Sequence, residues 1–163
     1  NRTALAPKPK TVEADSEEIL FYPLLFMTGH GNVVFNEKAV VNLRNYLISG
    51  GFLHISDNYG LDTSVRREMK KVFPELEFLE VPLDHPVYHQ NFSFSQLPKI
   101  HEHDGKRAQG FGLFYNERLV CFYYYESDLS DGWEDESIHN DPYELRLKAL
   151  QMGANIISYA FLN

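Results

Sequence analysis

The sequence lacks the features that mark membrane-spanning, nucleic-acid-binding and disulfide-rich proteins. It has one cysteine, Cys121, so no disulfide can form within the chain. Its 15 Lys and Arg are outnumbered by 23 Asp and Glu, which gives a formal charge of −8, and no basic stripe is present to bind phosphates. No apolar run approaches the roughly 18 residues that span a bilayer. Nucleic acid, an anionic membrane surface and a membrane-spanning segment are therefore poor expectations.

Several catalytic motifs are also absent. Gly29-x-Gly31 lacks the third glycine of a dinucleotide-binding fingerprint, and neither a P-loop nor an HExxH zinc motif occurs. Cys121 lies in the apolar run Leu119–Phe122, which favours a core residue over a nucleophile. Ser56 with His30 or His85 as its base is an alternative nucleophile, but no GxSxG elbow supports it. Classical glutamine hydrolysis and nucleotide binding are disfavoured.

The first half of the chain alternates between strand and helix patterns. At 163 residues, 44% of them hydrophobic, the chain suits one domain with a full core. Strands are predicted at 24–27, 52–55 and 76–81, with a further short strand at 11–14. Helices are predicted after an N-cap at Asn36 and after a cap at Asp62 or Thr63. This alternation predicts crossover connections and a mostly parallel sheet flanked by helices.

The second half has a different pattern. Residues 84–109 are loop-like and carry four of the seven histidines, and the segments 111–115 and 118–125 predict an added β-hairpin. An acidic loop spans 126–140. Its Asp128–Gly132 segment does not fit an EF-hand, so we interpret the loop as a solvated segment that Trp133 pins to the body. Asp141-Pro142 opens the last helix, and capping alone explains Asp141.

The order of the elements predicts where a site would lie. Loops after parallel strands meet at one edge of a sheet, where ligands bind. Asn58 and Asp84 are explained equally well as polar turn residues. We expect a polar site whose catalytic residues are His30, Asp57 and His85 and whose ligand-binding residues are Gly29, Gly31, Asn58, Tyr59 and Asp84.

Histidine spacing suggests a divalent metal, with zinc as the first choice. His101 and His103 would project from one face of a strand, and His85 and His89 could meet on a helical turn. Asp57 or Asp104 would supply an oxygen ligand. The alternative is that these imidazoles only bond backbone groups in a long polar loop. His54, inside a strand, is interpreted as a core histidine. The expected metal ligands are His89, His101, His103 and Asp104.

Eight segments carry a resemblance to a known family. They follow one another in order from about Phe21 to the C-terminus, with family-like spacing. The segments are Met27–Gly31, Gly50–Leu53, Asp57–Gly60, Arg66–Met69, Leu83–His89, Lys99–Gly105, Asp131–Asp135 and His139–Pro142. Together they resemble the bacterial family of domains of unknown function designated DUF4159.

The resemblance implies a Rossmann-like fold related to the class I glutamine amidotransferases, with no established activity. It also implies export or a place in a longer membrane-anchored protein, in the periplasm for instance. A strand and a helix would precede the single domain, residues 1–163. Our first hypothesis is a ligand-binding or assembly domain without the nucleophilic cysteine, whose partner is a small molecule or an envelope protein. The alternatives are a hydrolase, divalent-metal-dependent, that uses the His/Asp cluster, and an envelope scaffold without a pocket.

Overall fold

A five-stranded sheet forms the centre of the computed structural model, which describes residues 8–162. The strand order is β1-β2-β5-β4-β3, so β1 and β3 form the two edges. The strands are β1 Leu24–Gly29, β2 Phe52–Asp57, β3 Leu79–Glu80, β4 Gln109–Tyr115 and β5 Arg118–Tyr125. The helices are α1 Glu37–Ile48, α2 Asp62–Val72, α3 Glu136–His139 and α4 Tyr143–Leu162, with 3-10 turns η1 Glu17–Phe21, η2 Pro86–Tyr88 and η3 Asp131–Trp133.

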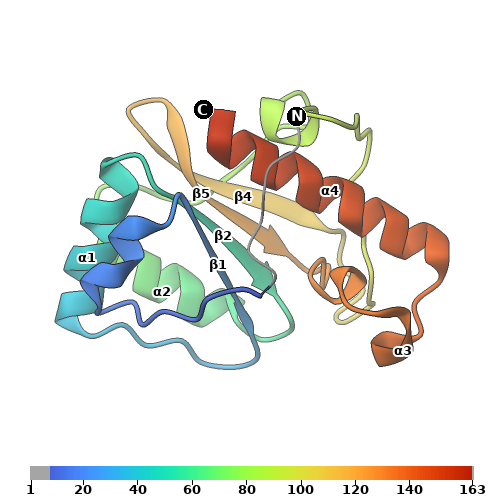
Figure 1. Ribbon diagram of the computed structural model, residues 1–163, viewed down its shortest axis with the longest axis horizontal. Helices are drawn as coiled ribbons and strands as arrows, with labels where there is room; N and C mark the ends of the chain where they lie inside the picture. The colour runs from blue at the N-terminus through green and yellow to red at the C-terminus, as the bar shows by residue number, and fades with distance from the viewer. Residues whose placement is uncertain (1–7, 163) are drawn as a thin grey trace.

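Helices cover both faces of the sheet. Figure 1 shows α1 and α2 on one side and the long helix α4 on the other. Leu53 and Ile55 of β2 pack in the core beneath α1 and α2, whereas Phe52 packs in the core beneath α4. Every residue of β2 is buried, as expected for a strand covered on both faces.

The sheet is mixed rather than mostly parallel. β1 pairs with β2 and β2 pairs with β5 in parallel, but β5–β4 and β4–β3 are antiparallel. The predicted hairpin 111–115/118–125 is present, yet it is not an appendage, because β5 lies between β2 and β4. The run from Leu119 to Tyr124 is fully buried. A continuous apolar run of this kind is typical of a central strand.

Some local expectations were right and others were wrong. The Asn36 side chain accepts a hydrogen bond from Ala39 N–H (2.8 Å), which confirms the predicted N-cap of α1. Asp62 is the first residue of α2 rather than its cap, and its carboxylate pairs with Arg66 (2.7 Å). The third strand is confined to Leu79–Glu80. Residues 11–14 form no strand.

One edge of the sheet collects four connecting segments. β1, β2 and β5 all end there, and β4 begins there because it is antiparallel to β5. We call this the carboxyl edge. β3 runs in the same direction as β2, but three strand spacings separate the two, roughly 14 Å at about 4.8 Å each. Within residues 8–162, no helix has both the length and the apolar character to cross a membrane.

Candidate metal centre

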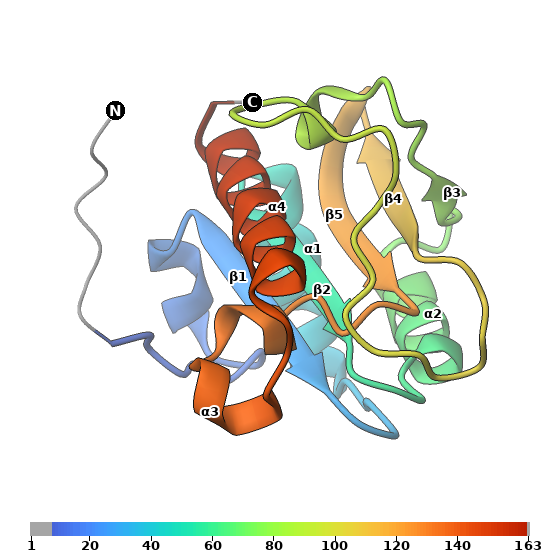
Figure 2. The same cartoon turned by 90° about the vertical axis from the view of Figure 1, so that its right-hand side faces the viewer.

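Segments from four places in the sequence meet at the carboxyl edge. They are the loops after β1 and β2, the segment 126–142 after β5, and the segment 99–108 that leads into β4 (Figure 2). The first two loops touch where Gly31 N–H donates to the Tyr59 carbonyl (3.4 Å). Gly31 has a φ of +82°, a conformation that glycine adopts without strain. The expected approach of these two loops is therefore present.

His101 contacts three carboxylates at this edge. Its Nδ1 lies 3.0 Å from Asp128 Oδ2 and 3.3 Å from Asp131 Oδ2, and its Nε2 lies 3.0 Å from Asp141 Oδ1. One imidazole thus joins the segment before β4 to three carboxylates that follow β5. Burial acts to lower the pKa of His101, but hydrogen bonds to Asp128 and Asp141 outweigh it and raise the pKa above its ordinary value.

His103 makes a second contact with the same carboxylates. Its Nε2 lies 2.5 Å from Asp128 Oδ2, although not in hydrogen-bonding geometry. The other side of the ring packs against Tyr59, with ring centroids 4.8 Å apart. Only 3% of the Asp128 side chain is exposed. The strand expected at His101 and His103 is absent, because both lie in the irregular segment before β4, but the two rings still meet at one buried carboxylate.

Three side chains lie close enough together to share one ion. One ligand atom each from His101, Asp131 and His139 lies within 4.8 Å of the others. His139 Nε2 is 3.8 Å from Asp131 Oδ2, and it also lies 2.9 Å from Glu134 Oε2. A tetrahedral ion with bonds of about 2.0–2.2 Å holds its ligand atoms roughly 3.3–3.6 Å apart. The separations at Asp131 Oδ2 (3.3 and 3.8 Å) bracket that range.

Asn58 orients the Asp131 carboxylate through a hydrogen bond. Its Nδ2 donates to Asp131 Oδ1 (3.0 Å), which leaves Oδ2 facing the histidines. Its Oδ1 accepts from Thr28 Oγ1 (2.8 Å) and Ser130 Oγ (3.1 Å). The side chain therefore ties the ends of β1 and β2 to the segment after β5. Partners of this kind orient metal-binding carboxylates.

Three ligand-type atoms of the cluster are buried without a hydrogen-bond partner among the described residues. They are Asp128 Oδ1, Asp141 Oδ2 and His103 Nε2. Buried polar atoms are nearly always satisfied, so several exceptions in one place need an explanation such as a bound ion. Burial, followed by the charge of Asp128, raises the pKa of Asp131. The cluster therefore holds more carboxylates than positively charged groups to balance them.

Backbone strain is concentrated in the same segments. Glu126 and Asp128 have φ angles of 58° and 48°, Asn140 has 57° and Tyr59 has 101°. Non-glycine residues seldom adopt positive φ, and such strain tends to collect at functional sites. Here it turns the chain sharply after β5, so that Asp128 points back toward the sheet edge. The prediction of a solvated acidic loop is wrong for residues 126–130, because all five are buried.

Asp57 and His30, both predicted site residues, have different surroundings. The Asp57 carboxylate accepts from Tyr59 N–H (2.9 Å), Leu61 N–H (3.1 Å) and the Tyr123 hydroxyl (3.1 Å). Burial raises its pKa despite these bonds. These contacts are sufficient to explain Asp57 as an organiser of the loop after β2. His30 is exposed on the loop after β1, beside Gly29.

The other predicted histidines and Asp84 lie away from the centre. The His85 ring packs against Tyr159 (5.4 Å between centroids) near the end of α4, whereas His101 contacts Asp141 just before α4 begins. Tyr159 comes 16 residues after Tyr143, which places it about 24 Å along the helix axis. Asp84 and His89 flank η2 at that far end. The expected convergence of His85 with Asp57 does not occur.

Sequence reasoning missed most of the carboxylates at the centre. Asp104 was proposed, but its carboxylate faces Lys106 (3.6 Å). The poor fit to an EF-hand gives no reason to expect Asp128 and Asp131 at the site, and the sequence predicts only a capping role for Asp141, whose Oδ1 contacts His101. The missing signal was the buried character of β5. A central strand puts the residues that follow it at the carboxyl edge.

The fold and this cluster define an α/β protein with a candidate metal centre at the carboxyl edge of its sheet. The family model described as "Domain of unknown function (DUF4159)" matches residues 1–161, so the chain belongs to that family. The family resemblance of the sequence motifs is thereby confirmed. No curated protein matches the chain.

Proposed function

We propose that this is a ligand-binding domain that holds a divalent metal ion, zinc in the first instance, between His101, Asp131 and His139. The observation that carries the proposal is that one ligand atom each from His101, Asp131 and His139 lies within 4.8 Å of the others. Beside them, three buried atoms of Asp128, Asp141 and His103 have no hydrogen-bond partner among the described residues. Two histidines and one carboxylate are a ligand set typical of zinc sites that keep a position open for a ligand. His139 is 31% exposed, so the centre opens to solvent.

Each residue around the centre has a part in the proposal. Asp141 would orient His101 through its Nε2, in the carboxylate–histidine arrangement common at zinc sites. Asp128, between His101 and His103, would supply a fourth ligand or accept a proton from a bound water. A bound ion would polarise an oxygen ligand and acidify a coordinated water. His30, Gly29 and Asn58, at the same edge, would line the approach to it.

The absence of cysteine chemistry is part of the same proposal. Cys121 is fully buried at the centre of β5, and burial raises the pKa of its thiol. A relationship to the amidotransferases would therefore extend to the α/β architecture without the nucleophile. Under this proposal the ion, rather than a thiolate, is the reactive group of the domain.

Zinc titration calorimetry on metal-stripped protein tests the proposal. We expect one zinc ion per chain, and His139→Ala should weaken binding by more than about tenfold because it removes a ligand. His89→Ala is the matched control, since His89 Nε2 lies 2.6 Å from the Leu83 carbonyl at the other end of the molecule. Fe²⁺ and Mn²⁺ in parallel titrations identify the preferred ion. Absence of stoichiometric binding, or equal effects of the two variants, would contradict the proposal.

Metal-dependent hydrolysis is a second candidate function, and one cavity favours it. A cavity of about 300 Å³ is lined by Tyr59, Asp104 and Glu126, among others. Tyr59 contacts His103, and Glu126 Oε1 accepts from Asp104 N–H (2.7 Å). A small substrate there would lie beside the metal centre. Turnover of p-nitrophenyl acetate by zinc-loaded protein, lost in His139→Ala and kept in His89→Ala, tests this function. Equal turnover in both variants would contradict it.

A further inference from the structure

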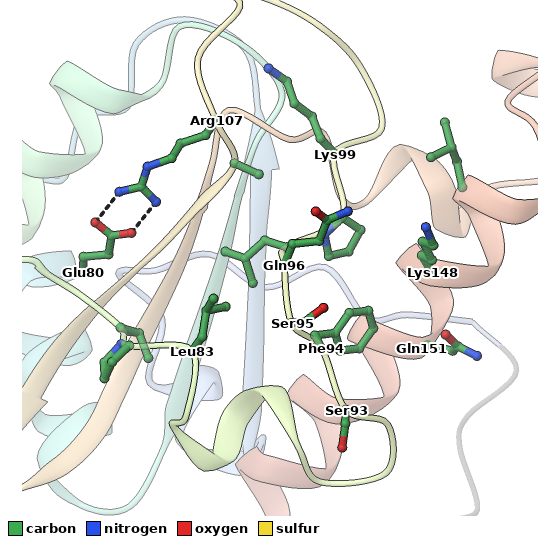
Figure 3. Close-up of a pocket in the computed structure, with 16 residues that line it drawn as sticks. Glu80, Leu83, Ser93, Phe94, Ser95, Gln96, Lys99, Arg107, Lys148 and Gln151 are labelled. Carbon is green, nitrogen blue, oxygen red and sulfur yellow. Dashed lines mark hydrogen bonds and ion pairs between the residues drawn. The ribbon is translucent and has the colours of Figure 1, made fainter.

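A large cavity in the described part of the chain is separate from the metal centre. It measures about 900 Å³, within the range of small-molecule sites, and lies between α4, the segment 93–99 and the end of β3. Figure 3 shows residues of α4 on one side, residues of the β3 region on the other, and Gln96 between them. Of the residues named above for the metal centre, none lines it.

The charge at this cavity contrasts with that of the whole chain. Three basic residues, Lys99, Arg107 and Lys148, and one acidic residue, Glu80, line it, although the chain carries a formal charge of −8. Glu80 engages Arg107 through both carboxylate oxygens (2.5 and 2.7 Å). Lys99 pairs with Glu102 (2.7 Å), which is outside the cavity. Lys148 has no ion pair or hydrogen bond within residues 8–162. Its positive charge is therefore not balanced by an acidic partner at the cavity.

The remaining lining provides both hydrogen-bonding groups and apolar surface. The side chains of Ser95, Gln96 and Gln151 form no hydrogen bond within the described residues. Gln151 follows Lys148 by three positions, so the two lie on neighbouring turns of one face of α4. The apolar lining comes from both sides of the cavity and includes Leu83, Phe94, Leu97 and Leu145.

From this balance we propose that the cavity binds a small amphipathic monocarboxylate. Its carboxylate would pair with Lys148 and accept hydrogen bonds from Gln151 or Gln96. Its apolar body would lie against Leu83 and Phe94. One free lysine with neutral amides suits a single negative charge. The bidentate arginine that would add to the binding of a more highly charged phosphate is already paired with Glu80. This site is independent of the metal centre.

Octanoate is the probe, and calorimetry on the whole chain is the measurement. Octanoate should bind, while octanol, which lacks the charge, and acetate, which lacks the apolar body, should bind at least several-fold more weakly. Lys148→Gln should weaken octanoate binding about three- to tenfold, the range of one ordinary hydrogen bond, because Lys148 is exposed and solvent screens its charge. Lys38→Gln is the matched control, because Lys38 is an exposed lysine on α1, at the opposite face of the sheet.

NMR and a variant of a cavity-lining residue test whether octanoate binds in this cavity. Octanoate should shift the side-chain amide signals of Gln96 and Gln151, and Leu83→Asn should weaken binding without unfolding the chain, because Leu83 is 44% exposed. No binding of octanoate, equal binding of octanol, or an unchanged affinity in Lys148→Gln overturns the proposal. Octanoate binding that is lost in Asp131→Ala but kept in Lys148→Gln places the ligand at the metal centre, which also overturns it.

Discussion

The two ends of the molecule each hold two histidines from the same long segment, in surroundings of different kinds. At the carboxyl edge, His101 and His103 face the carboxylate of Asp128. At the opposite end, His85 Nδ1 accepts from Val87 N–H (3.2 Å), and His89 contacts a backbone carbonyl. The hydrogen bonds of one pair are with the backbone, whereas the other pair has neighbouring carboxylate atoms that lack hydrogen-bond partners among the described residues. Spacing alone does not separate the two pairs, because their surroundings decide what each can bind.

The largest expected effect is the loss of a metal ligand at the carboxyl edge. Asp131→Ala removes the carboxylate that joins His101 to His139, so zinc affinity should fall by more than the roughly 100-fold that outer partners contribute. His85→Ala should leave zinc affinity unchanged. Calorimetric titration of both variants with zinc measures the difference. If both variants lose affinity equally, the two ends are not functionally distinct.

A smaller effect is expected for a residue that acts through Asp131. Asn58→Ala should lower zinc affinity about 10- to 100-fold, because Asp131 Oδ1 then loses the amide that orients it. Asn42→Ala removes an amide on α1 that bonds the Ala14 carbonyl (3.5 Å), and it should not affect zinc. Competition with a chromophoric chelator gives both affinities. An Asn58→Ala protein that binds zinc as wild type does would show that Asp131 needs no support.

Local sequence patterns predict the elements of this fold better than they predict the order of its strands. Helix signals were enough to place α1 and its Asn36 cap, and they do not depend on distant parts of the chain. The i, i+2 spacing predicted a strand at His101 and His103 that is absent, and the two rings meet because both contact Asp128. The position of β5 does depend on distant parts of the chain, because only the assembled sheet shows that this strand is inserted beside β2.

The wrong expectations at the site trace to two strands, β5 and β3. With 111–125 interpreted as an appended hairpin, Asp128 and Asp131 had no reason to approach His101. Conversely, His85 was placed at the carboxyl edge because the third strand was predicted over 76–81. The actual strand is two residues long, and the chain then turns back along α4 to His85. Long-range strand order is not encoded in local periodicity.

His54 provides a third histidine environment and a pH-dependent test. Its ring is buried between Phe26 and Phe122, and burial lowers its pKa to about 4. The unfolded chain, with an ordinary histidine pKa of 6.5, binds this proton more readily, so stability should fall as pH drops from 6.5 towards 4. The loss is at most about 1.4 kcal/mol per pH unit. Urea unfolding should show a shallower fall for His54→Phe. An identical slope would assign the loss to other groups.

The smallest effect is expected at the far end, where His85 caps a short turn. His85→Ala removes the acceptor for Val87 N–H at the start of η2, which should lower the free energy of unfolding by about 0.5–1 kcal/mol. His85→Asn keeps an acceptor and should recover part of that loss, but not the ring contact with Tyr159. Urea unfolding measures both variants. If asparagine recovers nothing, packing rather than capping explains His85, and if either variant weakens zinc binding, this end is coupled to the metal centre.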